Sequence, residues 1–234
     1  MTFDSKIINN ILDKLFPLPE QFGVIVSEYD ESEPINFYEI ECAVKEIDPN
    51  AYINYGMSKL VIVSPKIGEV VIKIPFNGYY LEDEETGELE WCPFEWASGT
   101  DASDYCLTEY EKYERLQTYN LDCFVAKTIF YKVRCGIRIF LQELVIPESE
   151  SLCSPKASKN SKDLAKEWKD KGIFHIDSEW IANCLDKYGK SKVERFLHYC
   201  SNLDLDILED VHRGNFGYRK NGEPCMLDFS NYED

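Results

Sequence analysis

The sequence lacks the features that would mark a secreted, zinc-binding or membrane-spanning protein. It has nine cysteines but no Cys-x-x-Cys pair, and the odd total fits neither a disulfide framework nor a zinc site. Its longest apolar runs are too short to span a bilayer, and the opening Met-Thr-Phe-Asp lacks the basic start of a secretory signal. We therefore expect a cytoplasmic protein with reduced thiols and no membrane partner.

Basic residues are also scarce, with 25 Lys and Arg against 43 Asp and Glu and a net charge of −18. This charge repels phosphate backbones, and no basic patch is visible, so we expect no direct nucleic-acid partner. The acidity indicates either a solubilising surface, which we favour, or an acidic mimic of DNA that occupies a nucleic-acid-binding protein. The 44% apolar content is enough for a packed core and excludes a disordered chain.

The hydrophobic pattern changes period along the chain and predicts an α+β fold. Helical spacing predicts helices over residues 4–16 and 36–47. From residue 49 to 146 the pattern predicts strand, strand, strand, helix, strand, strand, with no strand in the acid-rich segment 77–103. The run of acids at 82–85 predicts a solvated loop rather than a metal site.

The last third of the chain has a different pattern. A Ser/Pro/Lys-rich connector at 147–160 is followed by three stretches with helical spacing, at 161–171, 177–188 and 191–200. No internal repeat is present. We therefore expect a mainly helical region here.

The segment with the clearest chemical pattern runs from Asp210 to Asn215 as Asp-Val-His-Arg-Gly-Asn, and Asp228 follows it. Between them, Asn221-Gly222 is the strongest short turn signal in the chain. The hairpin closed by this turn would set Asn215 and Asp228 side by side. Amide and carboxylate oxygens are hard ligands suited to Mg²⁺, and a carboxylate beside them can accept a hydroxyl proton.

This segment resembles the catalytic loop and metal-binding strand of the protein-kinase-like superfamily, where Asp-x-His-x-x-Asn recurs. The separations, five positions from Asp210 to Asn215 and thirteen from Asn215 to Asp228, are typical of the family. The resemblance implies that Asn215 and Asp228 bind Mg²⁺. It also implies that Asp210 is the base that orients the attacking hydroxyl, and that His212 and Arg213 contact the transferred phosphate.

The upstream half offers partners for this segment. Lys73, in Val-Val-Ile-Lys, stands where the family has its strand-borne lysine, which implies that it holds the α and β phosphates of ATP. The predicted helix at 104–117 follows, as in the family, and supplies an acid to pair with Lys73. Glu109 is our first choice, and Glu111, on a different face of the helix, stays open as the alternative.

The remaining nucleotide contacts are implied by position. The family's phosphate-covering loop has three spaced glycines, whereas Asn-Tyr-Gly-Met-Ser-Lys has one, so Gly56 and Ser58 would present the backbone N–H groups. Glu143 and Val145 fall where the family has its inter-lobe hinge, whose backbone meets adenine.

Two departures from the family pattern limit what the resemblance implies. Leu208 stands where the family has a histidine, which removes a scaffold contact but no catalytic group. Only six residues follow Asp228, so we expect no activation segment and no helical platform for peptide substrates. Such abbreviated chains look most like bacterial or phage proteins.

Together these observations predict a protein-kinase-like bilobal fold. Its parts would be an N-terminal helical extension at 1–48, an N-lobe with a five-stranded antiparallel sheet at 49–146, and a reduced helical C-lobe at 147–234. The expected function is an ATP- and Mg²⁺-dependent phosphotransferase that acts on a protein or small-molecule hydroxyl. The alternatives are a catalytically inactive kinase-like (pseudokinase) module that binds nucleotide or a protein, and the acidic DNA mimic.

Overall fold

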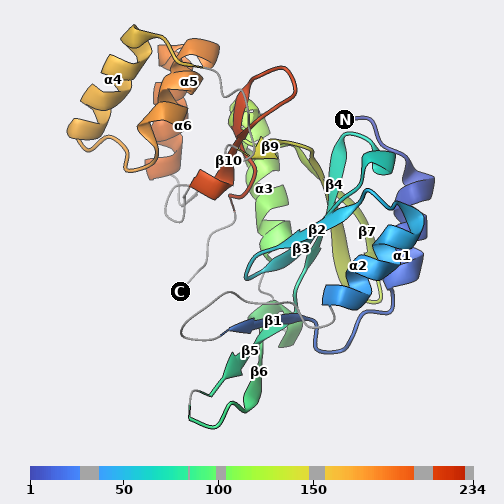
Figure 1. The fold of residues 1–234 in the computed structure, drawn as a ribbon. Helices are drawn as coiled ribbons and strands as arrows, with labels where there is room; N and C mark the ends of the chain where they lie inside the picture. The colour runs from blue at the N-terminus through green and yellow to red at the C-terminus, as the bar shows by residue number, and fades with distance from the viewer. Residues whose placement is uncertain (27–36, 84, 99–103, 148–155, 203–212, 230–234) are drawn as a thin grey trace. The chain divides into compact units, whose positions relative to one another are not determined.

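The computed structural model describes residues 1–26, 37–83, 85–98, 104–147, 156–202 and 213–229 (Figure 1). The chain divides into two compact units. Unit 1 comprises Met1–Tyr110 and Thr128–Glu143, and unit 2 comprises Glu111–Lys127 and Leu144–Asp234. The described part of the expected extension at 1–48 thus belongs to unit 1, together with the sheet.

Unit 1 is built on a five-stranded antiparallel sheet with the order β2-β3-β4-β8-β7. This finding confirms the α+β class and the antiparallel sheet predicted from the β-branched runs. The chain turns between β7 and β8 at Cys135 and Gly136, with φ values of 48° and 82°, a left-handed geometry that a glycine adopts without strain. The strands are β2 Tyr52–Tyr55, β3 Lys59–Val63, β4 Val70–Pro75, β7 Thr128–Arg134 and β8 Ile137–Glu143.

One face of this sheet is apolar and is covered by α1 (Ser5–Leu15) and α2 (Phe37–Ile47), which confirms the two predicted opening helices (Figure 1). Asp4 begins α1 by accepting hydrogen bonds from the backbone N–H groups of Lys6 and Ile7. Side chains alternate between the two faces of a strand, so every second residue joins this core. The fully buried strand residues on this apolar face are Leu60, Ile62, Val70, Ile72, Ile74, Ile139 and Leu141.

The expectation that 77–103 holds no strand is wrong. β5 (Gly78–Glu82) and β6 (Leu89–Pro93) form a hairpin, and β1 (Gly23–Val26) pairs with β5 in parallel to complete a second, three-stranded sheet. No strand signal is visible in the sequence here because acids flank and interrupt both strands, so neither shows a clean alternation of apolar and polar residues. The predicted solvated loop is present at the hairpin tip, where Glu82, Asp83 and Glu85 are exposed.

Unit 2 combines a helical core with a small sheet of order β11-β10-β9. Its core includes Trp180 stacked on Phe216 and Phe124 stacked on Phe196, with ring centroids 4.7 and 4.2 Å apart. The three helices and the C-terminal hairpin predicted for this region are confirmed. The elements are α4 Lys159–Asp170, α5 Ser178–Tyr188, α6 Lys190–Asn202, β9 Ile146–Pro147, β10 Phe216–Tyr218 and β11 Pro224–Met226.

Helix α3 (Tyr105–Thr118) contains the boundary between the two units, which falls between Tyr110 and Glu111, and so contributes residues to both. Among the described helices, none combines the length and the apolar content needed to cross a membrane.

Candidate functional site

The second face of the five-stranded sheet carries polar and charged side chains. The register places Val61 opposite Lys73, Lys73 opposite Phe140, and Thr128 opposite Gln142. Because side chains alternate along each strand, these residues point away from the apolar face. We call the set formed by Lys59, Lys73, Thr128, Gln142 and the helix residue Glu109 the ionic face.

Glu109 is the centre of the ionic face. Its Oε2 lies 2.7 Å from Lys73 Nζ, and its Oε1 lies 2.8 Å from Lys59 Nζ. The Glu109 side chain is fully buried, and the two lysine side chains are 3% and 4% exposed. Glu111 is exposed. The structure therefore pairs Lys73 with Glu109, the first choice from the sequence, and not with Glu111.

A polar side chain from the sheet borders the same carboxylate. Gln142 Nε2 lies 3.5 Å from Glu109 Oε2 and donates a hydrogen bond to Thr128 Oγ1 at 3.1 Å. These three residues come from β8, α3 and β7, so the carboxylate is held between two layers of unit 1. Taking such charges out of water costs free energy that an apolar cluster of similar volume would not. A buried charged cluster of this kind is therefore a candidate functional site.

The first turn of α3 is anchored by a second buried carboxylate. Asp104 accepts a hydrogen bond from Leu107 N at 2.7 Å and lies 3.1 Å from the Arg138 guanidinium. Burial raises the pKa of Asp104, and the hydrogen bonds from Leu107 and Arg138 oppose this shift. Burial also raises the pKa of the Cys106 thiol well above its usual range, so this cysteine is a neutral core residue and not a nucleophile.

The predicted phosphate-covering residues lie at the turn between β2 and β3. The N–H of Gly56 donates to the Lys59 carbonyl at 3.3 Å, and Ser58 is buried with its carbonyl accepting from Phe76 N at 2.9 Å. A Cβ placed on Gly56 would meet nothing within 4 Å, so packing does not demand a glycine here. The turn leads directly into Lys59, which connects it to the ionic face.

The two expected hinge residues belong to different units. Glu143 is the last residue of β8 in unit 1, and Val145 lies in a small buried cluster of unit 2 with Ala126 and Cys225. Gly217 of β10 allows the chain to approach at Val145, because a Cβ on Gly217 would lie 2.6 Å from Val145 Cγ1.

In unit 2 the hairpin brings Asn215 and Asp228 to the open ends of β10 and β11. The register pairs Phe216 with Met226, and Leu227 N donates to the Asn215 carbonyl at 2.8 Å. Asn215 is buried and Asp228 half-buried. The hairpin predicted from Asn221-Gly222 is thus confirmed, with Gly222 at a φ of 80°.

The strand that leads to Asp228 is fixed from two sides. Ala126 N donates to the Met226 carbonyl at 2.7 Å, and the buried Lys112 donates from Nζ to the Phe229 carbonyl at 3.2 Å. Among the residues the structure describes, no three His, Cys, Asp or Glu side chains gather into a metal cluster.

Three of the predicted catalytic residues fall at or beyond the edge of the described chain. Asp210 and His212 lie outside the described residues. Of Arg213 only the backbone is described, in a short 3-10 helix, Arg213–Asn215.

Sequence reasoning missed Lys59, Gln142 and Thr128. The pairing of β3 with β4 could have revealed Lys59. It places Val61 opposite Lys73, and Lys59, two residues before Val61, points to the same face of the sheet. The chain matches no protein-family model, no curated protein and no solved structure in the three comparisons made.

Proposed function

We propose that this protein is an ATP- and Mg²⁺-dependent phosphotransferase of protein-kinase-like fold, with a protein or small-molecule hydroxyl as acceptor. The observation that carries the proposal is the buried Lys73–Glu109 pair, with 2.7 Å between Nζ and Oε2. In protein kinases a strand lysine and a helix glutamate must pair before the lysine can hold the nucleotide phosphates. Asp210, Asn215 and Asp228 follow this pair along the chain in the order of the kinase-like pattern that the sequence resembles.

Unit 1 would supply the contacts to the triphosphate. Glu109 holds the Lys73 ammonium in place, so that Lys73 donates hydrogen bonds to the phosphate oxygens without first losing rotamer freedom. Lys59 is held by the other oxygen of the same carboxylate. We assign Lys59 a supporting role in neutralising phosphate charge. Glu109 would then position two ammonium groups, those of Lys59 and Lys73.

Unit 2 would supply the metal ligands and the base. Mg²⁺ usually takes one or two protein oxygens and completes its shell with phosphate oxygens and water, so an Asn and an Asp are a fitting donor set. Bound Mg²⁺-ATP would supply the phosphoryl group. Asp210 accepts the proton of the acceptor hydroxyl, and His212 and Arg213 contact the oxygens of the transferred phosphate.

The second candidate function is a kinase-like module that binds nucleotide or a protein without catalysis. The observation that favours it is the β2–β3 turn, where the N–H of Gly56 is already bonded to the Lys59 carbonyl. A loop with one glycine and an occupied N–H offers less to a γ-phosphate than a loop with several free N–H groups.

The experiment that tests the proposal measures transfer or release of the γ-phosphate from radiolabelled ATP with Mg²⁺. The variants are Asp210→Ala and Asp228→Asn, and Asp163→Asn, an exposed aspartate on α4, is the control. We expect activity in the wild type and the control, and a loss of about 100-fold or more in the two site variants.

The competing outcomes are distinct when a thermal shift with ATP and Mg²⁺ measures nucleotide binding beside this assay. Nucleotide binding by the wild type without transfer or hydrolysis would favour the non-catalytic module. Activity that survives both site substitutions would contradict the assigned roles of Asp210 and Asp228.

A further inference from the structure

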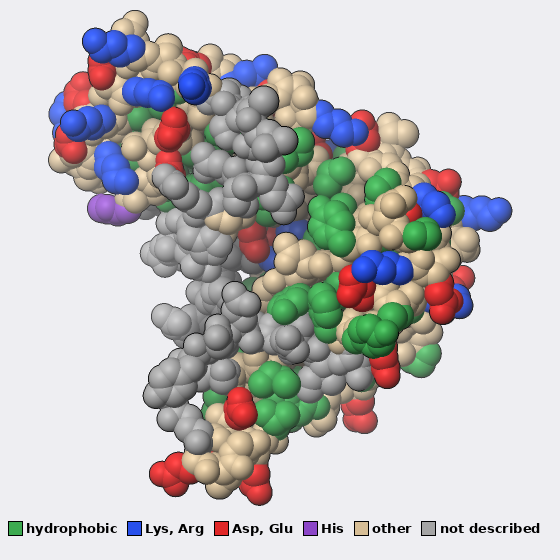
Figure 2. All heavy atoms as spheres, viewed as in Figure 1, with side chains coloured by type: hydrophobic (Ala, Val, Ile, Leu, Met, Phe, Trp, Pro, Cys, Tyr) green, Lys and Arg blue, Asp and Glu red, His purple; other side chains and the backbone are tan. Residues whose placement is uncertain are grey.

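The second sheet of unit 1 lies in a part of the chain that has no basic side chain. Residues 15–44 and 74–111 contain no Lys, Arg or His, while they contain seven and eleven acids respectively. All three strands β1, β5 and β6 come from these two segments. Figure 2 shows red acidic side chains and no blue basic ones on the β5–β6 hairpin, at the lower end of the view.

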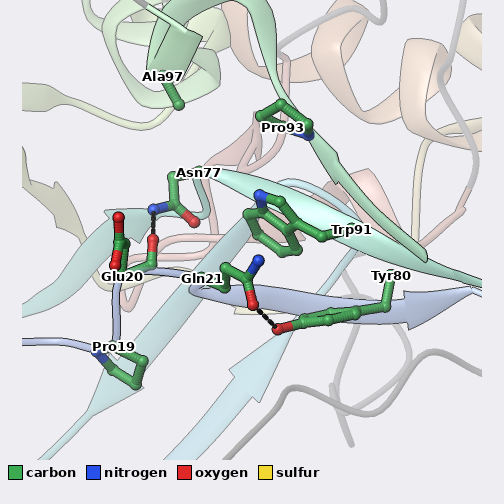
Figure 3. Close-up of a pocket in the computed structure, with 8 residues that line it drawn as sticks. All are labelled: Pro19, Glu20, Gln21, Asn77, Tyr80, Trp91, Pro93 and Ala97. Carbon is green, nitrogen blue, oxygen red and sulfur yellow. Dashed lines mark hydrogen bonds between the residues drawn. The ribbon is translucent and has the colours of Figure 1, made fainter. Parts of the chain in front are cut away.

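A pocket of about 730 Å³ opens beside this sheet (Figure 3). Its wall is made by the segment that precedes β1, by the open end of the β5–β6 hairpin where β5 begins and β6 ends, and by the short 3-10 helix Glu95–Ser98. The side chains that carry the argument are Glu20, Gln21, Asn77, Tyr80, Trp91 and Ala97. We call this cavity the Trp91 pocket.

Hydrogen bonds hold the rim of the Trp91 pocket in place. Asn77 donates from Nδ2 to the Glu20 carbonyl at 2.6 Å and accepts from Phe22 N at 2.7 Å. The Tyr80 hydroxyl donates to Gln21 Oε1 at 2.6 Å, as the dashed line in Figure 3 shows. The segment that precedes β1 is therefore bonded to Asn77 and Tyr80 at the rim of the pocket.

The aromatic part of the pocket is also built into the sheet. Gly23 and Gly78 are paired in register, and a Cβ on Gly78 would lie 2.5 Å from Trp91 Cζ2. Because Gly78 has no side chain, the Trp91 indole can pack directly against the backbone at this position. The Tyr80 and Trp91 rings lie 4.8 Å apart at 57°, and both side chains stay half-exposed.

These features select a cationic occupant. The face of an indole or phenol ring attracts a cation, and a guanidinium can in addition stack flat on the ring. The carboxylate of Glu20 stands at the same pocket, and the surrounding segments add only negative charge. An anionic ligand would meet repulsion from every charged group that these segments carry.

We propose that the Trp91 pocket docks an arginine side chain from an extended segment of a partner protein. Leu81 and Leu89 on the same hairpin are 45% and 46% exposed, and they offer apolar contact to residues that flank the arginine. The proposal does not depend on phosphotransfer, because the pocket and the ionic face share no residue.

The test is fluorescence anisotropy with a labelled pentapeptide that has two arginines between leucines. Its twin has citrulline, which is neutral and nearly isosteric, in place of each arginine. We expect saturable 1:1 binding of the arginine peptide and binding of the citrulline peptide that is about 10-fold weaker or less.

Three substitutions locate the binding. Trp91→Leu and Glu20→Gln each should weaken binding, by about 3- to 30-fold for the tryptophan. Ala97→Arg should block the pocket with a competing cation, and because Ala97 is exposed, this variant keeps the test sound even if Trp91→Leu fails to fold. Glu39→Gln, an exposed acid on α2 outside the pocket, is the matched control and should bind as the wild type does.

The proposal is overturned by any of three results. These are an arginine peptide that does not saturate, a citrulline peptide that binds equally well, and a Glu39→Gln variant that weakens binding as much as Glu20→Gln. The last result would mean attraction to diffuse acidity instead of a docked side chain.

Discussion

The two faces of the five-stranded sheet are made by alternate residues of the same strands, yet one buries an apolar core and the other buries a charged cluster beside apolar residues such as Phe140. Ile72 and Ile74 point into the apolar face under α1 and α2, while Lys73 between them points to Glu109 on the ionic face. Both sets are almost completely removed from water. The difference is that one set gains free energy from burial and the other must offset a desolvation cost.

This contrast separates the residues that specify the fold from those assigned to the function. Burying an isoleucine or leucine side chain contributes about 1.5–3 kcal/mol, so the apolar face is sufficient reason for α1, α2 and the sheet to pack. Buried ion pairs are weak evidence for stability, since apolar replacements are often as stable. Stability alone therefore does not explain the ionic face.

The largest expected effect comes from removing the centre of the ionic face. Glu109→Ala leaves the ammonium groups of Lys59 and Lys73 without the carboxylate that both contact, which should cost about 3–5 kcal/mol of unfolding free energy. Urea unfolding measures this loss. Glu111→Ala, two residues away and exposed, should change stability by less than about 0.5 kcal/mol. Equal losses in the two variants would contradict the account of α3.

The second prediction compares neighbours on one strand. Ile72→Ala opens a cavity in the apolar face and should cost about 2–4 kcal/mol. Lys73→Met should cost less than Glu109→Ala, because Glu109 keeps its contact with Lys59 and methionine fills a similar volume. Urea unfolding of both variants would sharpen the comparison. A Lys73→Met variant less stable than Glu109→Ala would contradict the claim that the ionic face depends most on Glu109.

The smallest effects concern two buried carboxylates whose pKa values shift in opposite directions. The Ser64 hydroxyl donates to Asp48 at 2.6 Å and lowers the pKa of that carboxyl, whereas burial raises the pKa of Asp104. A lowered folded pKa stabilises the fold above the unfolded value of about 3.9 and loses this contribution as pH falls. A raised folded pKa has the reverse effect, with a contribution that is lost as pH rises through the folded value.

The stability difference between the wild type and Asp48→Asn should therefore grow as the pH rises from 3 to 6, while the difference for Asp104→Asn should shrink. Urea unfolding across this pH range measures both slopes. Slopes of the same sign for the two variants would contradict the opposite pKa shifts of Asp48 and Asp104.

Much of the fold could be predicted from the sequence, because its signals are local. The strands of the main sheet are β-branched runs, and the C-terminal hairpin has an Asn-Gly turn whose glycine has the expected positive φ of 80°. The second sheet could not be predicted in the same way. β1 has only four residues and depends on pairing with β5, where Gly23 stands opposite Gly78, 55 positions along the chain.

The residues of the candidate site likewise fall into those with a signal in the sequence and those that depend on the tertiary structure. Lys73 and Glu109 were predicted because their residue types and order along the chain resemble the kinase-like family pattern. The choice between Glu109 and Glu111 depends on which side of α3 meets the sheet, and the sequence left it open because the apolar stripe of this helix is imperfect. Lys59 was missed, since its contact with Glu109 follows from the pairing of β3 with β4 and not from any motif.

The most direct test of the central claim is a calorimetric titration of Mg²⁺-ATP into the wild type, Lys73→Met and Lys66→Met, the last being an exposed lysine before β4. The account predicts saturable binding by the wild type and by Lys66→Met, and binding weakened about 10-fold or more in a folded Lys73→Met. Equal affinity in all three proteins, or a wild type that does not bind, would contradict the claim that the ionic face holds nucleotide phosphates.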